Sequence, residues 1–347
     1  MKLIICLLFT FCAFHHDNKS VVVKQISSVN PEHCSKYTLK DSTAKKPILD
    51  ITFKVSLYSY QGLDPNILEV PFRLSGNLML VEAELNDKKG FFIFDSGAPE
   101  LIVNAKYLPN HRFNEEREAT GVTGDIAQVR LQTIEQFKWQ EYSLQKTRIK
   151  AIDMSHIERV RNEEILGLIG FELFKDFEVL LDFKISKIFL YKLDRSGEKL
   201  SLREDDKTPD HQASFTLADH VPILRLTLGE NTLDFGLDTG AEMNILDIRS
   251  KSKVLSYFTI KKRGLLYGNG QDQIEILMGE ISGLELEKVK FPNLKAMLAD
   301  LRHLNKAYGV KLDGVLGYHF LIQFKLALNF VKKEIYLWKP ALVSTQK

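Results

Sequence analysis

The chain has 347 residues, of which 44% are hydrophobic, so it can bury a sizeable core in two domains of ordinary size or one large one. Lysine and arginine total 47 and aspartate and glutamate total 45, which gives a net charge of +2 with both signs mixed along the chain. This composition excludes a disordered chain and gives no reason to expect a nucleic acid or an acidic membrane as a partner.

Near the N-terminus, Lys2 is followed by a mostly apolar run up to residue 14, which has the length of a signal-peptide core and is too short to span a bilayer. We expect residues 1–14 to be a signal peptide or an N-terminal anchor, and the protein to be exported to the periplasm, the cell surface or the medium of a bacterium. A buried N-terminal strand is the alternative. Removal of the leader would leave Cys34 as the single thiol, so stability must come from the core.

Residues 15–69 form a polar segment with some β character, to which the sequence assigns no role beyond the option of adding strands. After it the chain contains an internal repeat. Residues 79–98 align without a gap to residues 222–241 at an offset of 143, and residues 167–192 align to residues 314–339 at an offset of 147. Two related copies therefore follow one another in a single chain.

The repeated segments have the pattern of strands, because apolar residues alternate with polar ones in short runs bounded by Gly, Asn and Asp. Both members of the first aligned pair predict a β-hairpin whose second strand ends at an aspartate. Short helices are expected at residues 171–177, 318–324 and 294–308. The expected divisions are the leader (1–14), the polar segment (15–69), the first copy (70–192), a polar linker (193–211), the second copy (212–340) and a tail (341–347).

Each copy carries an Asp-Ser/Thr-Gly-Ala turn after a strand, at residues 95–98 and 238–241. A glycine-punctuated apolar segment follows each turn about 70 residues later, at residues 166–170 and 314–317. Glycine lets backbone N–H groups approach the carboxylate, and the hydroxyl of the neighbouring residue can form a hydrogen bond across a pseudo-twofold axis. Two such turns that face each other would bring two carboxylates together.

These motifs resemble those of the aspartic proteases, and the DSGA and DTGA turns are most similar to the retropepsin-like branch. In that family each lobe contributes one Asp-Thr/Ser-Gly turn, and the later apolar-apolar-Gly segment runs beside it to close a ψ-shaped loop. The resemblance covers roughly residues 70–192 and 212–339. It implies a mostly β, bilobal acid-protease fold, with two β-barrel lobes related by pseudo-twofold duplication, that is catalytically complete as a monomer.

The resemblance further implies an aspartic endopeptidase that acts on a peptide or protein substrate. Asp95 and Asp238 would share one proton, activate a water molecule and protonate the scissile carbonyl, without a metal, a cofactor or a covalent intermediate. The residues that would support this dyad are Ser96, Gly97, Thr239 and Gly240.

A flap over the dyad is expected from two glycine-punctuated segments, residues 120–125 and 264–271, which begin about 25 residues after each aspartate. The candidates in them are Gly121, Gly124, Tyr267 and Gly268. In pepsin-like relatives a flap tyrosine precedes a glycine. The Tyr-Gly pair of this chain resembles that arrangement but lies in the second copy instead of the first.

Alanine follows both turns, as Ala98 and Ala241, where a serine or threonine would offer another hydroxyl to the ionised dyad. The loss of that donor should raise the pKa of the dyad, so we expect a pH optimum that is mildly acidic to neutral.

Two other functions stay open. The first is a non-catalytic exported peptide-binding protein with the same fold, and the second is a latent, narrow-specificity processing protease inhibited by residues 15–60. The presence of both aspartates favours the enzyme. The histidines show no His-Glu-x-x-His spacing, so the sequence predicts no metal site.

Overall fold

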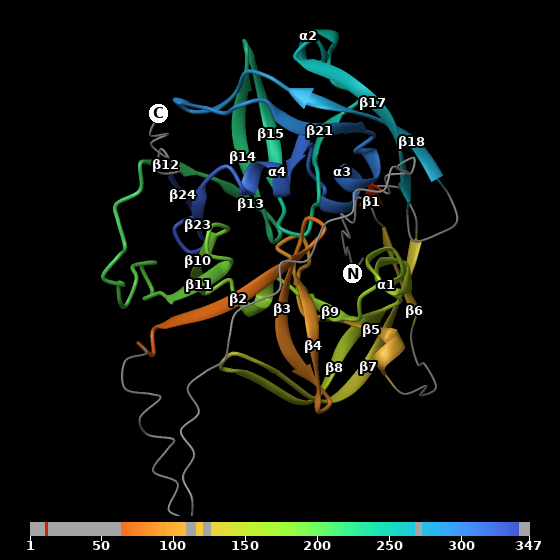
Figure 1. The fold of residues 1–347 in the computed structure, drawn as a ribbon, viewed down its shortest axis with the longest axis vertical. Coiled ribbons are helices and arrows are strands. Elements are labelled where there is room, and N and C mark those ends of the chain that lie inside the picture. Colours follow the sequence, from red (N-terminus) through yellow and green to blue (C-terminus); the bar gives the residue numbers. More distant parts are fainter. Residues whose placement is uncertain (1–10, 13–63, 109–115, 121–125, 268–272, 340–347) are drawn as a thin grey trace, which may run out of the picture. The chain divides into compact units, whose positions relative to one another are not determined.

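The computed structural model describes residues 11–12, 64–108, 116–120, 126–267 and 273–339, all of which belong to one structural unit (Figure 1). Most of the expected leader, the polar segment up to residue 63 and the tail lie outside the described residues. We refer to residues 64–192 as the first half and to residues 211–339 as the second half.

The protein is mostly β, as the alternating sequence pattern predicts. The first half contains β2 (Ile67–Ser75), β3 (Leu78–Leu85), β4 (Lys88–Phe94), β5 (Ile102–Asn104), η1 (Ala105–Tyr107), β6 (Glu116–Thr120), β7 (Ile126–Trp139), β8 (Tyr142–Ile152), α1 (Ser155–Arg161), β9 (Ile165–Ile169), η2 (Phe171–Leu173), β10 (Phe177–Asp182) and β11 (Lys187–Lys192). A two-residue strand, β1 (Phe11–Cys12), precedes it and pairs with β17.

The second half repeats much of this order. It contains β12 (His211–Ser214), β13 (Thr216–Ala218), β14 (Val221–Leu228), β15 (Asn231–Leu237), β16 (Asn244–Asp247), α2 (Ser252–Leu255), β17 (Phe258–Tyr267), β18 (Gln273–Ile281), β19 (Leu284–Leu286), β20 (Val289–Lys290), β21 (Leu294–Ala299), α3 (Arg302–Tyr308), β22 (Gly314–Leu316), α4 (Tyr318–Leu321), β23 (Lys325–Asn329) and β24 (Glu334–Trp338). Within the described residues no helix has the length and apolar character needed to cross a membrane.

Both expected hairpins are confirmed, as β3–β4 and β14–β15. In the first of them the chain reverses at Asn86 and Asp87, which both have positive φ angles, 48° and 63°. Asparagine and aspartate tolerate this region better than most residues, and it suits the twist of a two-residue hairpin turn. In the second hairpin Gly229 supplies the positive φ, 62°. Local turn chemistry thus fixes the register of the strands that lead to each aspartate.

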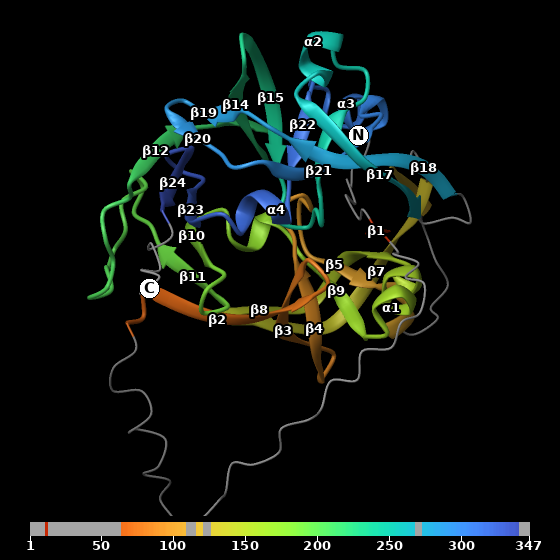
Figure 2. The ribbon, with the colours of Figure 1, turned by 45° about the horizontal axis from the view of Figure 1, so that its top comes forward.

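The same pairing of three strands occurs in each half, and Figure 2 shows β4, β5 and β9 in the first half and β15 and β22 in the second. Strand β9 pairs in parallel with β4 and antiparallel with β5, and β22 pairs in parallel with β15 and antiparallel with β16. Gly167 and Gly314 occupy matching places, opposite Phe92 and Phe235. A Cβ at either glycine would overlap the facing phenylalanine ring and a backbone carbonyl, which explains the glycine in each apolar run.

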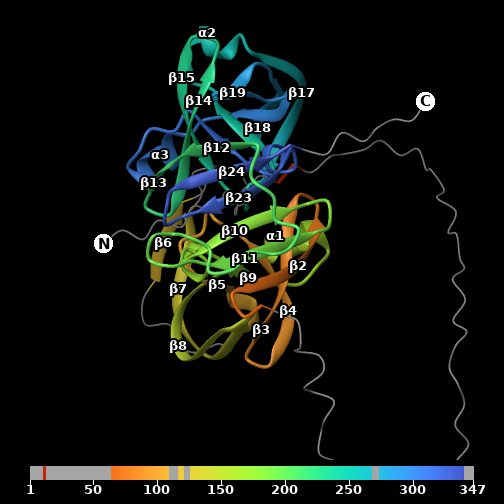
Figure 3. The same ribbon diagram turned by 90° about the vertical axis from the view of Figure 1, so that its left-hand side faces the viewer.

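The described strands form two sheets, one of 11 strands and one of 13. The larger sheet includes strands from both halves, because β10 pairs antiparallel with β23 and places Val179 opposite Leu328. Figure 3 shows β12, β24, β23, β10, β11 and β2 following one another, from the part of the molecule that holds the second half to the part that holds the first. The two halves therefore share backbone hydrogen bonds as well as side-chain packing.

Three expectations need correction. The helix expected at residues 294–308 is a helix only over Arg302–Tyr308, because Leu294–Ala299 is a strand that pairs with β16 and β18 inside the sheet. The helices expected at 171–177 and 318–324 are single turns, Phe171–Leu173 and Tyr318–Leu321. Strand β2 begins at Ile67, three residues before the expected start of the first copy, because its backbone pairs with β11 from that residue.

Candidate active site

Asp95 and Asp238 lie at equivalent places, each directly after the last residue of the second strand of its hairpin. The backbone N–H of Asp95 donates to the carbonyl of Ile169 at 3.0 Å, and that of Asp238 donates to the carbonyl of Leu316 at 2.9 Å. Strands β9 and β22 therefore fix the start of each turn. Both aspartates are almost fully buried, with 2% and 1% of their surface exposed.

Each turn folds back onto its own carboxylate. The N–H of Gly97 donates to Asp95 Oδ1 at 2.8 Å, and the N–H of Gly240 donates to Asp238 Oδ1 at 2.7 Å. Asp95 Oδ1 also accepts a bond from the N–H of Ala98 at 3.1 Å. These donors stabilise the charged form of the carboxyl groups, which burial disfavours.

The two turns are joined to each other by their hydroxyl residues. The N–H of Ser96 donates to Thr239 Oγ1 at 2.8 Å, and the N–H of Thr239 donates to Ser96 Oγ at 3.0 Å. Thr239 Oγ1 in turn donates to the carbonyl of Phe94 at 3.0 Å. All these groups are buried, so each hydrogen bond replaces one that water can no longer supply.

Thr239→Ala is expected to lower the free energy of unfolding by about 2–4 kcal/mol, because it leaves the Ser96 N–H and the Phe94 carbonyl buried without this partner. Urea unfolding of the variant measures the loss. Thr239→Ser is the matched control, since it keeps the hydroxyl and should lose far less. Equal stability of the alanine and serine variants would contradict the structural role of this hydroxyl.

Gly97 and Gly240 are needed because each approaches the carboxyl group of the opposite turn. A Cβ on Gly97 would lie 2.5 Å from Asp238 Oδ2, and a Cβ on Gly240 would lie 2.5 Å from Asp95 Cγ. Real Cβ atoms do not come this close to other heavy atoms, so any side chain at either position would force the two turns apart.

The two carboxyl groups form one titrating pair. Burial raises the pKa of Asp238 to about 6, although the backbone N–H of Gly240 and the hydrogen bond with Asp95 lower it. Burial raises the pKa of Asp95 well above its ordinary value, and the negative charge of Asp238 raises it further. Two carboxylates this close cannot both ionise at low cost, so the pair holds one proton over the range between its two apparent pKa values.

Each turn is also held by residues of the opposite half, which the sequence analysis did not find. His220, between β13 and β14, places Nε2 2.8 Å from the carbonyl oxygen of Gly97, and Tyr308 at the end of α3 places its hydroxyl 3.5 Å from the same oxygen. His220 is 6% exposed. A residue in the second half thus makes a buried hydrogen bond to the turn that carries Asp95.

The turn that carries Asp238 is held through Glu242, which is buried and follows the motif directly. Arg161, at the end of α1, forms an ion pair with the Glu242 carboxylate. Asn77 Nδ2 donates to the Glu242 carbonyl at 3.0 Å, and its N–H lies 3.4 Å from Oε2. Burial raises the pKa of Glu242, although Arg161 acts in the opposite direction.

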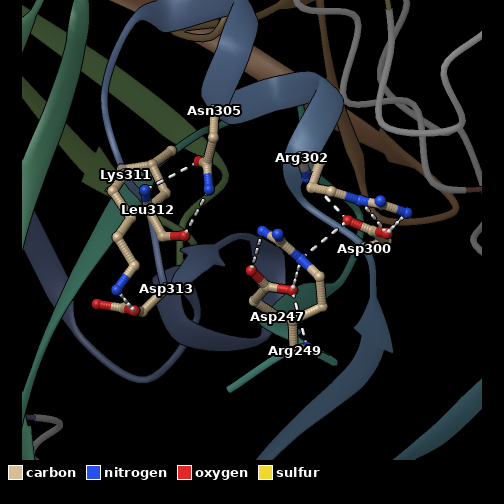
Figure 4. Close-up of polar contacts among 8 residues, drawn as sticks. All are labelled: Asp247, Arg249, Asp300, Arg302, Asn305, Lys311, Leu312 and Asp313. Carbon is tan, nitrogen blue, oxygen red and sulfur yellow. Dashed lines mark hydrogen bonds and ion pairs between the residues drawn. The ribbon is translucent and has the colours of Figure 1, made fainter. Parts of the chain in front are cut away.

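The strand beside Asp238 is fixed at its start by a polar network around α3 (Figure 4). Asn305 receives a hydrogen bond from the N–H of Leu312 at 2.9 Å and donates one to its carbonyl at 3.1 Å. The N–H of Asp247 donates to the carbonyl of Asp313 at 2.9 Å. These bonds set the position of β22, which accepts the backbone bond from Asp238.

The flap candidates are described only in part. Strands β6 and β7 pair up to Thr120 and Ile126, and β17 and β18 pair up to Tyr267 and Gln273. The described ends of these strand pairs therefore flank the two expected flap segments. Of the four candidates, Gly121, Gly124 and Gly268 lie outside the described residues, and only the backbone of Tyr267 is described.

Within the described part of the chain, no group of three or more His, Cys, Asp or Glu residues is arranged to hold a metal ion. No protein-family model matches the sequence, and a search of curated proteins finds no match. The function is therefore inferred from the residues and geometry of this site.

Proposed function

We propose that the protein is an aspartic endopeptidase whose two catalytic aspartates, Asp95 and Asp238, lie in one chain. One observation carries the proposal: two Asp-Ser/Thr-Gly turns, related by the sequence repeat, bury two carboxyl groups so close together that a Cβ on either turn glycine would meet the opposite carboxyl group. A buried carboxyl pair is costly to keep, because each charge loses its hydration. Such a cost is expected where the shared proton is used in chemistry.

We further propose that the two halves are retropepsin-like lobes of a bilobal acid-protease fold. The proposal is supported by the three-strand arrangement that recurs around each aspartate, at offsets of 143 and 147 that match those of the sequence repeat. It is also supported by the sheet that β10 and β23 form across the halves. A single chain would then hold both turns and act as a monomer.

In the proposed mechanism the ionised Asp238 takes a proton from a water molecule, whose oxygen attacks the carbonyl carbon of the scissile peptide bond. Asp95 donates its proton to the carbonyl oxygen, which gives a neutral tetrahedral diol. Asp238 then returns its proton to the amide nitrogen while Asp95 takes a proton from a diol hydroxyl, and the carbon–nitrogen bond breaks to give a carboxylic acid and an amine. The starting proton is placed on Asp95 as part of this proposal, because burial and the negative charge of Asp238 both raise the pKa of Asp95.

The rate is expected to depend on pH as this pair titrates. Because the pKa of Asp238 is about 6, lowering the pH below that value protonates the base and should reduce kcat/KM. Raising the pH until Asp95 loses its proton should reduce it again. The buried Ala98 and Ala241 offer no hydroxyl that would lower these pKa values. A profile of kcat/KM from pH 3 to 9 should peak in the mildly acidic to neutral range, and a maximum near pH 3 would contradict this expectation.

The proposal is tested by incubating the full chain with a mixed peptide library from pH 3 to 8 and identifying the products by mass spectrometry. Internal cleavage that a pepstatin-type hydroxyl-bearing mimic inhibits is the expected result. No cleavage by the folded protein at any pH would overturn the proposal of an active enzyme and favour a peptide-binding protein or a latent protease.

A further inference from the structure

We infer, on the basis of the proposed function, that His220 is a positioning residue for Asp95. It holds the peptide group between Gly97 and Ala98, and the N–H of that peptide group donates a hydrogen bond to the Asp95 carboxyl group. The ring of His220 reaches the Gly97 carbonyl from the opposite half. The N–H of Ala98 belongs to the same peptide group and donates to Asp95 Oδ1.

The contact defines which nitrogen of the histidine carries a proton. A carbonyl oxygen accepts hydrogen bonds and cannot donate one, so Nε2 at 2.8 Å from Gly97 must be protonated. The ring lies among aromatic side chains, with centroid distances of 6.2 Å to Phe171 and 5.8 Å to Tyr308. Packing against these two rings holds the Nε2–H donor in one direction.

A peptide group that accepts at its carbonyl becomes a better donor at its N–H, because hydrogen bonds in a buried chain polarise one another. The bond from His220 to Gly97 should therefore strengthen the 3.1 Å bond from Ala98 to Asp95 Oδ1. It also restricts rotation of the peptide plane. His220, a residue of the second half, thereby orients the carboxyl group of Asp95 in the first half.

The arrangement is not repeated at the other aspartate. Asn77 precedes His220 by 143 residues, the offset of the repeat, and it binds Glu242 instead of the turn glycine. Among the described contacts, the carbonyl of Gly97 is bound by a histidine from the opposite half, and no histidine makes the equivalent contact at the turn that carries Asp238. His220 therefore acts on one turn of the pair.

The charged groups that act on His220 are Asp219, which favours its protonation, and Lys150, which opposes it. Tyr308 shares its acceptor. Burial is the strongest influence and lowers the pKa of the ring. Burial thus favours the neutral form of the ring, in which Nε2 carries the proton that binds Gly97.

The test measures the dyad itself. Aspartate side chains labelled with carbon-13 are titrated by NMR in the full chain, with the Asp95 signal assigned by its loss in Asp95→Asn, and kcat and KM are measured on a library-derived peptide. The variants are His220→Phe, which keeps an aromatic ring without the donor, and His220→Gln, whose side-chain amide can restore it. His319→Phe is the control, because His319 is a half-buried histidine that packs on an aromatic ring but has no described contact with either aspartate turn.

His220→Phe should raise the higher apparent pKa of the dyad by roughly 0.5 to 1 and lower kcat about five- to tenfold at nearly constant KM. His220→Gln should restore much of the wild-type value of the apparent pKa and of kcat, and His319→Phe should match the wild type in both quantities. Dyad titrations that coincide in His220→Phe and wild type would overturn the inference. A shifted titration in a protein that cleaves no peptide would support the positioning role while rejecting the proposed activity.

Discussion

Asp95→Asn and Asp238→Asn are each expected to reduce peptide cleavage by at least about a thousandfold, because each removes either the proton donor or the base of the proposed reaction. Asparagine has nearly the same shape as aspartate and can keep the backbone hydrogen bonds of the turn through its side-chain oxygen. The loss should therefore appear in kcat, with the fold intact by circular dichroism. A variant that retains a tenth of wild-type activity would exclude its aspartate from the mechanism.

Asp238→Asn should also make the folded protein more stable at pH 8. The pKa of Asp238 is raised from 3.8 to about 6 by burial, so the folded state holds its proton more tightly than the unfolded state does. Between about pH 4 and pH 6 the unfolded state releases that proton while the folded state still holds it. The free energy of unfolding of the wild type therefore falls over this range and stays lower above it. Removal of the charge should recover roughly 1–3 kcal/mol above this range and little at pH 3.

Urea unfolding at pH 3 and pH 8 measures the difference. The wild type and Asp238→Asn should be similar at pH 3, and the variant should be more stable at pH 8. The opposite order at pH 8 would mean that the carboxylate stabilises the fold, which would contradict a buried pair held for catalysis.

Gly240→Ala is expected to lower kcat/KM by about a hundredfold or more and to destabilise the fold. The new methyl group would lie 2.5 Å from Asp95 Cγ, so the turn or the opposite carboxyl group must move. Small displacements of a catalytic group commonly have effects of this size. Steady-state kinetics with a library-derived peptide measures the loss, and urea unfolding measures the stability.

Gly236→Ala is the matched control, because it makes the same change in the strand that leads to Asp238. A Cβ there would meet only side-chain carbons of Leu312 and Val221, at 3.3 Å, and these can adjust. It should therefore retain most activity. Equal losses in the two variants would show that strand packing, not the approach to Asp95, explains the need for glycine.

The features that the sequence predicted are those that depend on short segments of the chain and that occur in both copies of the repeat. The β3–β4 and β14–β15 hairpins follow from alternation and turn residues within about 20 positions, and the duplication made each pattern more specific. The glycines of β9 and β22 were found for the same reason. One Asp-Ser-Gly turn alone would have been uninformative, because such turns are common.

The features that the sequence did not predict depend on contacts between distant segments. Leu294–Ala299 became a strand because β16 and β18 flank it, and neither neighbour is visible in the segment itself. Strands β10 and β23 pair across 151 residues, as at Glu178 and Asn329. His220 carries no motif, and its only sequence clue is its place at the repeat offset from Asn77.

The measurement that tests the shared dyad most directly is a double-mutant cycle of kcat/KM with Asp95→Asn, Asp238→Asn and both together. Groups that act as one unit are strongly non-additive, so the double variant should be nearly as active as either single variant, within a few-fold. Losses that multiply in the double variant would contradict the proposal, because they would show two aspartates that contribute independently instead of sharing one proton.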